Sequence, residues 1–270
     1  MAAIRFSRGA AAALLALAAC SEAVPPPPPP APETYEAAAP QGSPNCDERS
    51  FEGSRFTVCA IDTARDEVRL AWRGADGRPL RSLAALEGSL GADAARVRFA
   101  MNAGMYDEEG APIGLFVEQG EERKTLSRKG GSGNFHLLPN GVFAVDARGQ
   151  LSVTATTAFR KQVPAPVWAT QSGPMLVIDD KLHPKFDANG TSQLVRNGVG
   201  VARPDKAFLV MSEDGVSFGR FARLFRDELG CRNALYLDGS VSSLWDPGSG
   251  RQDAYSQLGP MIVVLRRPAS

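Results

Sequence analysis

The chain contains 270 residues, and its 30 Lys and Arg side chains balance 30 Asp and Glu side chains, for a formal net charge of +0. This balance leaves no excess of positive charge, so the composition argues against nucleic acid or an anionic membrane surface as a partner. The chain has four Cys, without a Cys-x-x-Cys pair, and two His. These counts argue against a structural zinc site and against a catalytic zinc held by three histidines.

Residues 1–19 have the pattern of a lipoprotein signal peptide. Arg5 and Arg8 precede an apolar run over residues 10–19, which is shorter than the roughly 20 residues needed to span a bilayer. Leu17-Ala-Ala-Cys20 fits the bacterial lipobox, in which the Cys thiol is lipidated and becomes the mature N-terminus. We therefore expect an exported protein, held only by a lipid on Cys20 at the outer membrane or another membrane that faces the periplasm.

Residues 20–44 are rich in Pro and Ala, with consecutive prolines at residues 25–30. This composition cannot bury a core and favours a polyproline II spacer of about 3 Å per residue. The remaining residues, 45–270, are enough for one substantial hydrophobic core. We expect them to form one domain and the protein to be a monomer.

Hydrophobic periodicity along residues 45–270 predicts a strand-rich, mixed α+β domain. Strands are expected at residues 55–61, 67–72, 97–101, 113–118, 134–138, 142–146, 151–156, 167–171, 175–179, 207–211, 233–237 and 261–265. Helices are expected at residues 82–95, behind a Ser82 cap, and at residues 218–229, where apolar side chains share one face. Pro139-Asn-Gly141 predicts the tight turn of a hairpin.

The cysteines beyond the lipobox indicate an oxidising compartment. Cys46 and Cys59 flank a short segment that contains a glycine, and they are predicted to close a small disulfide loop. Cys231 is then left as a buried, structural thiol.

Six short segments that carry Gly or Asn lie next to apolar runs. They are Met101-Asn-Ala-Gly-Met105, Gly133-Asn-Phe135, Asn140-Gly-Val-Phe143, Gln171-Ser-Gly-Pro174, Arg196-Asn-Gly-Val-Gly200 and Leu235-Tyr-Leu-Asp-Gly239. In the last of these, Asp238-Gly239 breaks a strand and leaves a carboxylate at the rim of a sheet. In order and spacing, the six segments resemble the phosphodiester glycosidase family, which includes the lysosomal uncovering enzyme. The resemblance runs from about Cys46 to the end of the chain.

The resemblance implies a glycosidase that hydrolyses a sugar-1-phosphodiester, such as an N-acetylglucosamine-1-phosphodiester, in the cell envelope. Such a reaction needs a group that meets positive charge at the anomeric carbon and donors for the phosphate. Asp238 is the expected carboxylate. Arg196 is the expected phosphate clamp, because its planar fork matches phosphate oxygens and Gly198 and Gly200 let backbone come close. Asn102 is expected to bond sugar hydroxyls. The other substrate-binding positions that the resemblance implies are Gly104, Asn134, Gln171, Ser172, Gly173, Gly239 and Ser242.

Other interpretations stay open at this stage. Asp238 can be an anchor of its own turn, and Arg196 an ordinary surface ion pair. A second carboxylate is not identified among Asp107, Glu108 and Glu118. The domain can also bind envelope polysaccharide without cleaving it, although 7% aromatic residues argue against that. In a third reading, a metal-dependent phosphodiesterase holds calcium or magnesium on Asp238, Asn102 and backbone carbonyls; no other cofactor is expected.

Overall fold

The structure is a computed structural model that describes residues 43–268. The expected signal peptide, the lipidation site Cys20 and the expected linker as far as residue 42 lie outside the described residues. Within residues 43–268, three sheets and three short α-helices make up the regular structure, so the prediction of a strand-rich, mixed α+β fold is confirmed. No helix of this described part is long and apolar enough to cross a membrane.

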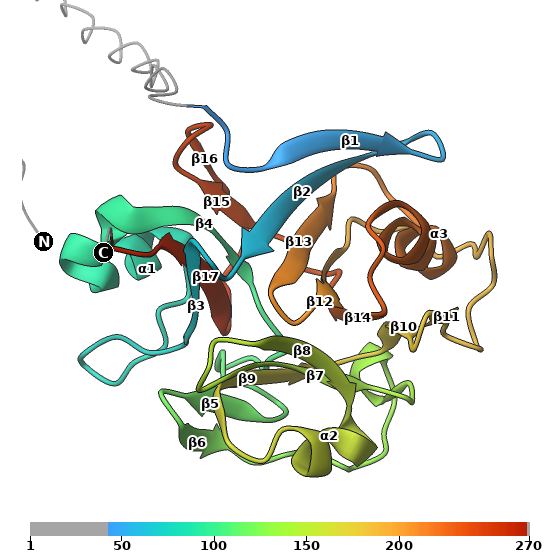
Figure 1. Ribbon diagram of the computed structural model, residues 1–270, viewed down its shortest axis with the longest axis horizontal. Coiled ribbons are helices and arrows are strands. Elements are labelled where there is room, and N and C mark those ends of the chain that lie inside the picture. Colours follow the sequence, from blue (N-terminus) through green and yellow to red (C-terminus); the bar gives the residue numbers. More distant parts are fainter. Residues whose placement is uncertain (1–42, 269–270) are drawn as a thin grey trace, which may run out of the picture. The chain divides into compact units, whose positions relative to one another are not determined.

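The first sheet contains the strand that ends at Asp238. Its order is β1 (Asp47–Phe51), β2 (Ser54–Asp62), β13 (Lys206–Ser212), β12 (Asn197–Arg203), β14 (Asn233–Asp238), β10 (Met175–Ile178) and β11 (Lys181–Leu182), and all neighbours are antiparallel. Helix α3 (Phe218–Arg223), capped by Ser217 and continued by a π-helical turn over Leu224–Glu228, covers one face of this sheet (Figure 1). Phe221 and Phe225 supply its apolar face, as the helical spacing predicts.

The second sheet has the order β16 (Arg251–Gln252), β15 (Leu244–Asp246), β4 (Val97–Asn102), β17 (Met261–Arg266) and β3 (Asp66–Ala71). Helix α1 (Leu83–Leu90) packs on it, and the Ser82 side chain caps the helix by accepting a hydrogen bond from the Ala85 amide. A 3₁₀ helix (Gly91–Arg96) follows, so the predicted helix over residues 82–95 is divided into two pieces.

The third sheet has the order β6 (Glu121–Lys124), β5 (Phe116–Glu118), β9 (Pro166–Ser172), β7 (Gly141–Asp146) and β8 (Leu151–Ala155). Helix α2 (Thr156–Gln162) lies on its outer face, where Phe159 packs against Val142 and Ala169 (Figure 1). The inner faces of the three sheets meet in one large core, to which Phe143, Leu235 and Ile262 contribute, one from each sheet. The three sheets therefore stabilise one another through this shared apolar interior.

Some local predictions were wrong, and some elements were not predicted. Residues 134–138 do not form a strand: Asn134–His136 form a 3₁₀ helix, and the Asn140 side chain holds the following turn by donating to the Phe135 carbonyl. The hairpin is instead made by β7 and β8, so Pro139-Asn-Gly141 leads into a strand and does not turn between two. Residues 197–203, where no strand was predicted, form the central strand β12. Helix α2 was missed because its first turn begins with β-branched threonines, which favour strands.

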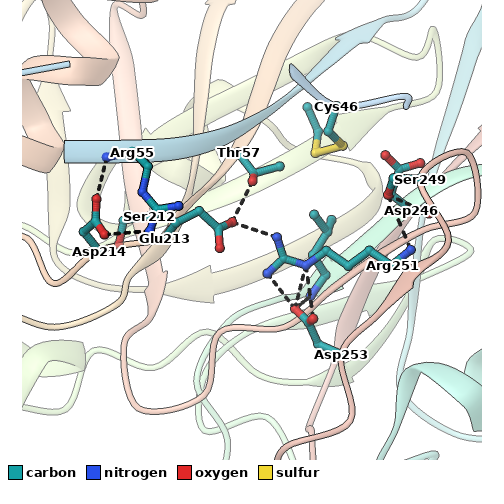
Figure 2. A network of polar contacts seen from close by, with 12 residues as sticks. Cys46, Arg55, Thr57, Ser212, Glu213, Asp214, Asp246, Ser249, Arg251 and Asp253 are labelled. Carbon is teal, nitrogen blue, oxygen red and sulfur yellow. Dashed lines mark hydrogen bonds and ion pairs between the residues drawn. A yellow bond between two sulfur atoms is a disulfide. The ribbon is translucent and has the colours of Figure 1, made fainter. Parts of the chain in front are cut away.

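The structure joins Cys46 and Cys59 in a disulfide, which is the pairing expected from the sequence, and Cys231 is a free, buried thiol. Next to the disulfide, a polar network links the first and second sheets (Figure 2). Thr57 Oγ1 donates to Glu213, and Arg251 donates to both Glu213 and Asp253. This network ties strand β2 to strand β16 across the molecule.

Candidate active site

A cavity of about 370 Å³ opens at the C-terminal end of β14. Two tyrosines, three other polar or charged side chains and four apolar side chains line it: Tyr106, Tyr236, Asn134, Asp238, Ser240, Met105, Ile113, Leu194 and Val241. A larger cavity, of about 620 Å³, lies beside the network of Figure 2, but Arg251 and Asp246 there bond to neighbouring protein groups. The cavity at β14 is the one that contains a predicted catalytic carboxylate.

Asp238 is the last residue of β14 and is 8% exposed. Burial raises the pKa of its carboxyl, while hydrogen bonds from the backbone amides of the following turn act in the opposite direction. Its Oδ1 accepts from the Gly239 amide at 2.6 Å and from the Ser240 amide at 2.8 Å. Within residues 43–268, no Lys, Arg or His lies at ion-pairing distance from this carboxylate. Asp238 is thus an oriented, largely desolvated carboxyl group that faces a cavity, which is an arrangement common at functional sites.

Asn102 does not line the cavity and is fully buried at the end of β4. Its Oδ1 accepts from the Ser243 amide and from Asn197 Nδ2, and Asn197 Oδ1 in turn accepts from the Asp238 amide at 2.8 Å. The expectation that Asn102 bonds sugar hydroxyls is therefore wrong in this structure. Asn102 and Asn197 instead hold the ends of β4, β12 and β14 in register. Sequence reasoning missed Asn197, although it lies in the quoted Arg-Asn-Gly segment.

Tyr236 is a further site residue that sequence reasoning missed, because it was taken as part of an apolar strand. It precedes Asp238 by two residues on β14, so both side chains point to the same face of the sheet. Asn134 lines the cavity beside it and is a hydrogen-bonding neighbour of its hydroxyl. Burial raises the pKa of Tyr236 to about 12, and Arg196 acts in the opposite direction. The phenol is therefore neutral at ordinary pH.

The Arg196 guanidinium, the expected phosphate clamp, does not face the cavity. Its side chain is fully buried behind Tyr236 and does not line the cavity. Nε donates to the Val216 carbonyl at 2.8 Å, Nη2 donates to Ser192, and Nη1 donates to the Tyr236 hydroxyl at 3.4 Å. The guanidinium also lies over the Phe218 ring, 3.8 Å from its centroid. Burial lowers the pKa of this group, and within the described residues no carboxylate lies at ion-pairing distance from it.

Gly198 and Gly200 also have a different role from the one expected. A Cβ on Gly200 would collide with Phe225 of the π-helical turn, and one on Gly198 would overlap the Leu235 carbonyl and press on Phe221 and Phe225. These glycines therefore allow the helix to pack closely on strand β12. The expectation that they bring backbone close to a phosphate is wrong.

Four predicted substrate-binding positions are structural. The Gln171 side chain makes four hydrogen bonds, to the Leu115 amide, to both backbone groups of Ser127 and to Thr156. Ser172 Oγ donates to the Leu237 carbonyl. A Cβ on Gly104 would collide with the Gln171 carbonyl, and one on Gly173 with Asn140. These residues hold the third sheet against the strand ends and do not line the cavity.

Of the remaining predictions, Asn134 lines the cavity and Gly239 borders it, while Ser242 has a buried Oγ without a hydrogen-bond partner in the described part of the chain. None of the open candidates for a second carboxylate, Asp107, Glu108 and Glu118, lines the cavity. Across residues 43–268, no group of three or more His, Cys, Asp or Glu side chains is placed to hold a metal ion.

Gly239 brings the tyrosine and the carboxylate together. A Cβ on Gly239 would overlap the Tyr236 hydroxyl, whereas the backbone conformation of Gly239 is one that alanine adopts without strain. We expect Gly239→Ala to lower kcat/KM by about tenfold or more, because it must displace either the hydroxyl or the Asp238 turn. Steady-state kinetics with a melting curve measures this. Gly88→Ala in helix α1, where a Cβ meets nothing, is the matched control; equal activity of both variants would contradict a role for the contact.

Comparison with known proteins identifies the family of this chain. The model of the phosphodiester glycosidase family matches residues 95–263, and the chain belongs to that family. The chain is 33% identical, over 225 residues, to the uncharacterized protein YigE of Escherichia coli K12, a match that covers 82% of this chain and 87% of that protein. The resemblance carried by the six segments is thus confirmed.

Solved structures share the fold at low sequence identity. The catalytic domain of zebrafish N-acetylglucosamine-1-phosphodiester alpha-N-acetylglucosaminidase, auto-inhibited by its pro-peptide, is similar with a TM-score of 0.54 and 15% identity, covering 86% of this chain and 87% of that one. A hypothetical protein from Synechocystis is similar with a TM-score of 0.53 and 16% identity, covering 82% of this chain and 61% of that one. Family membership supports a hydrolase of the phosphodiester glycosidase kind.

Proposed function

We propose that this chain hydrolyses sugar-1-phosphodiesters, with Asp238 acting at the anomeric carbon. The observation that carries the proposal is the separation of charge around one cavity. Asp238 presents a buried carboxyl without a cationic partner in the described residues, while the Arg196 guanidinium, equally without a carboxylate partner there, lies behind Tyr236. A substrate whose anomeric carbon becomes positive as its phosphate leaves is complementary to this pair of charges.

The reaction breaks the bond between the anomeric carbon and the phosphate oxygen, and the electron pair leaves with the phosphate. Asp238 stabilises the positive charge that develops on the sugar ring, and water then supplies a hydroxyl to the anomeric carbon and releases a proton. Because the departing phosphate monoester is a good leaving group, the reaction needs less help from a general acid than ordinary glycoside hydrolysis. This suits a cavity whose described lining contains one carboxylate, that of Asp238.

We place the activity in the cell envelope, on a sugar phosphate or on a polysaccharide that carries sugar-1-phosphodiesters. The lipobox at Cys20 and the Pro-rich spacer support a protein that is lipid-anchored and held off its membrane, and we expect it to act as a monomer. The Cys46–Cys59 disulfide also fits an oxidising compartment.

The test is a panel of sugar-1-phosphodiesters offered to the purified protein, with the matching sugar-1-phosphates and neutral glycosides for contrast. We expect release of free sugar from the diesters, and activity that survives exhaustive chelation. Loss of activity that calcium or magnesium restores would instead support a metal-dependent enzyme with oxygen ligands near Asp238. Saturable binding of envelope polysaccharide without any product would support the non-catalytic alternative.

A further inference from the structure

We propose that the Tyr236 hydroxyl is the group that contacts the substrate's phosphate, and that Arg196 is a positioning residue that acts through Tyr236. This inference rests on the proposed function and adds to it which residue binds the phosphate. It also changes the expectation from sequence, in which the Arg196 guanidinium itself was to grip the phosphate oxygens.

The position of the Tyr236 hydroxyl is determined by its surroundings. The ring is buried and packs edge-on against Phe218, with 4.8 Å between the ring centroids. The hydroxyl lies against Gly239, at the one point of the Asp238 turn where no side chain is present. Tyr236 lines the cavity, and its hydroxyl lies next to the turn that orients the carboxylate.

The proton of this hydroxyl is available to a ligand. The oxygen faces two donors, Arg196 Nη1 at 3.4 Å and the Asn134 side chain, and within residues 43–268 the hydroxyl donates to no acceptor. Tyr106, the other tyrosine of the cavity, differs in this respect, because its hydroxyl donates to the Gln257 carbonyl at 2.9 Å. A donor polarised by a cation is a strong partner for a phosphate oxygen. Tyr236 is thus the tyrosine equipped to bind an anion.

Arg196 contributes its charge from behind the tyrosine. Its Nε and Nη2 bond to Val216 and Ser192, and its central carbon lies 5.5 Å from the centroid of the Tyr236 ring. A buried cation without a counter-ion is unfavourable, and its field is weakly screened in the protein interior. A phosphate oxygen at the Tyr236 hydroxyl would supply the missing negative charge without touching the guanidinium. The same hydrogen bonds keep Nη1 directed at the tyrosine.

The first experiment measures the affinity of the purified protein for inorganic phosphate by calorimetry, so that it needs no turnover. We expect Tyr236→Phe, which removes only the hydroxyl, to weaken phosphate binding by about tenfold to a hundredfold and to lower kcat/KM for diesters by a similar factor. Tyr255→Phe is the matched control, because that tyrosine is 86% exposed and lies outside the cavity lining. Wild-type protein that binds no phosphate, or a Tyr236→Phe variant with unchanged affinity and kinetics, would overturn the proposal.

The second experiment tests whether Arg196 acts through Tyr236. Arg196→Met removes the charge and Arg196→Lys keeps it, so we expect a loss of phosphate affinity in the first that the second partly restores. In the Tyr236→Phe background, Arg196→Met should cost less than about twofold further, because the group it acts on is already gone. If the double variant instead loses phosphate affinity by the product of the two single-variant factors, the positioning role is refuted. If Arg196→Met does not fold, Ser192→Ala replaces it in the same comparison, because it removes the hydroxyl that accepts a hydrogen bond from Arg196 Nη2.

These outcomes separate the two proposals. Protein that hydrolyses diesters while Tyr236→Phe matches wild type would refute the role of Tyr236 and leave the function intact. Protein that hydrolyses no diester, yet loses phosphate affinity in Tyr236→Phe, would refute the function and leave the anion site intact.

Discussion

Replacing Asp238 with Asn is expected to lower kcat by about a thousandfold or more, which corresponds to about 4 kcal/mol of lost transition-state stabilisation. Asparagine keeps the size of the side chain and an oxygen that accepts from the Gly239 and Ser240 amides, so the turn is preserved. What it removes is the negative charge that meets the developing charge on the sugar. Initial rates with the best diester of the panel, together with circular dichroism, measure the effect.

Asp205→Asn is the control for this substitution, since Asp205 has an exposed side chain and pairs with Arg203 outside the cavity lining. A folded Asp238→Asn protein that keeps more than about a tenth of wild-type activity, a deficit below about 1.4 kcal/mol, would show that the carboxylate only anchors its turn.

The raised pKa of Asp238 predicts how both activity and stability depend on pH. The folded protein binds the proton of Asp238 more tightly than the unfolded chain does. The stability that this binding contributes is therefore present below the ordinary pKa of aspartate and is lost as the pH rises through the raised value. Asparagine does not ionise, so Asp238→Asn should melt at or above the wild-type temperature at neutral pH. Wild-type kcat/KM should rise with pH through the raised pKa, and this limb should be absent in Asp238→Asn.

Among the substitutions proposed for this protein, removal of the Cys46–Cys59 disulfide should lower the free energy of unfolding most. The two cysteines are separated by 13 positions, and closing a loop of that length contributes about 3 kcal/mol in the chain-entropy description. For a domain of this size we expect the double Cys46→Ala, Cys59→Ala variant to melt roughly 6–12 °C lower. Alanine is the better replacement, because both positions are buried and a serine hydroxyl there would need a partner.

Treatment with a reductant distinguishes the effect of losing the disulfide from the effect of the alanine substitutions. It should lower the melting temperature of the wild-type protein by about as much as the double variant does, and it should leave the variant unchanged. Equal melting temperatures for oxidised wild type and the variant, with the disulfide verified by mass spectrometry of non-reduced peptides, would contradict the prediction.

Sequence alone predicted the features that depend on near neighbours along the chain. Alternating apolar residues predicted β3, apolar-rich runs predicted β2 and β17, and the Ser82 cap marked the start of α1. The break at Asp238-Gly239 predicted a carboxylate at a strand end, where the structure has it. These signals are local, because a strand, a cap and a turn each involve only a few consecutive residues.

Only the tertiary structure decided which polar residues face the cavity. Gly198 and Gly200 have the same sequence signature whether the space beside them admits a ligand or a helix, and it is the packing of Phe225 that fills it. Arg196 and Gln171 were predicted at the site, but both bond to backbone groups far along the chain. Tyr236 was not predicted there, and its contacts with Gly239 and Arg196 position its hydroxyl. The spacing of Tyr236 and Asp238 puts both on one face of β14, but whether that face is core or cavity depends on contacts between distant segments, which local patterns do not contain.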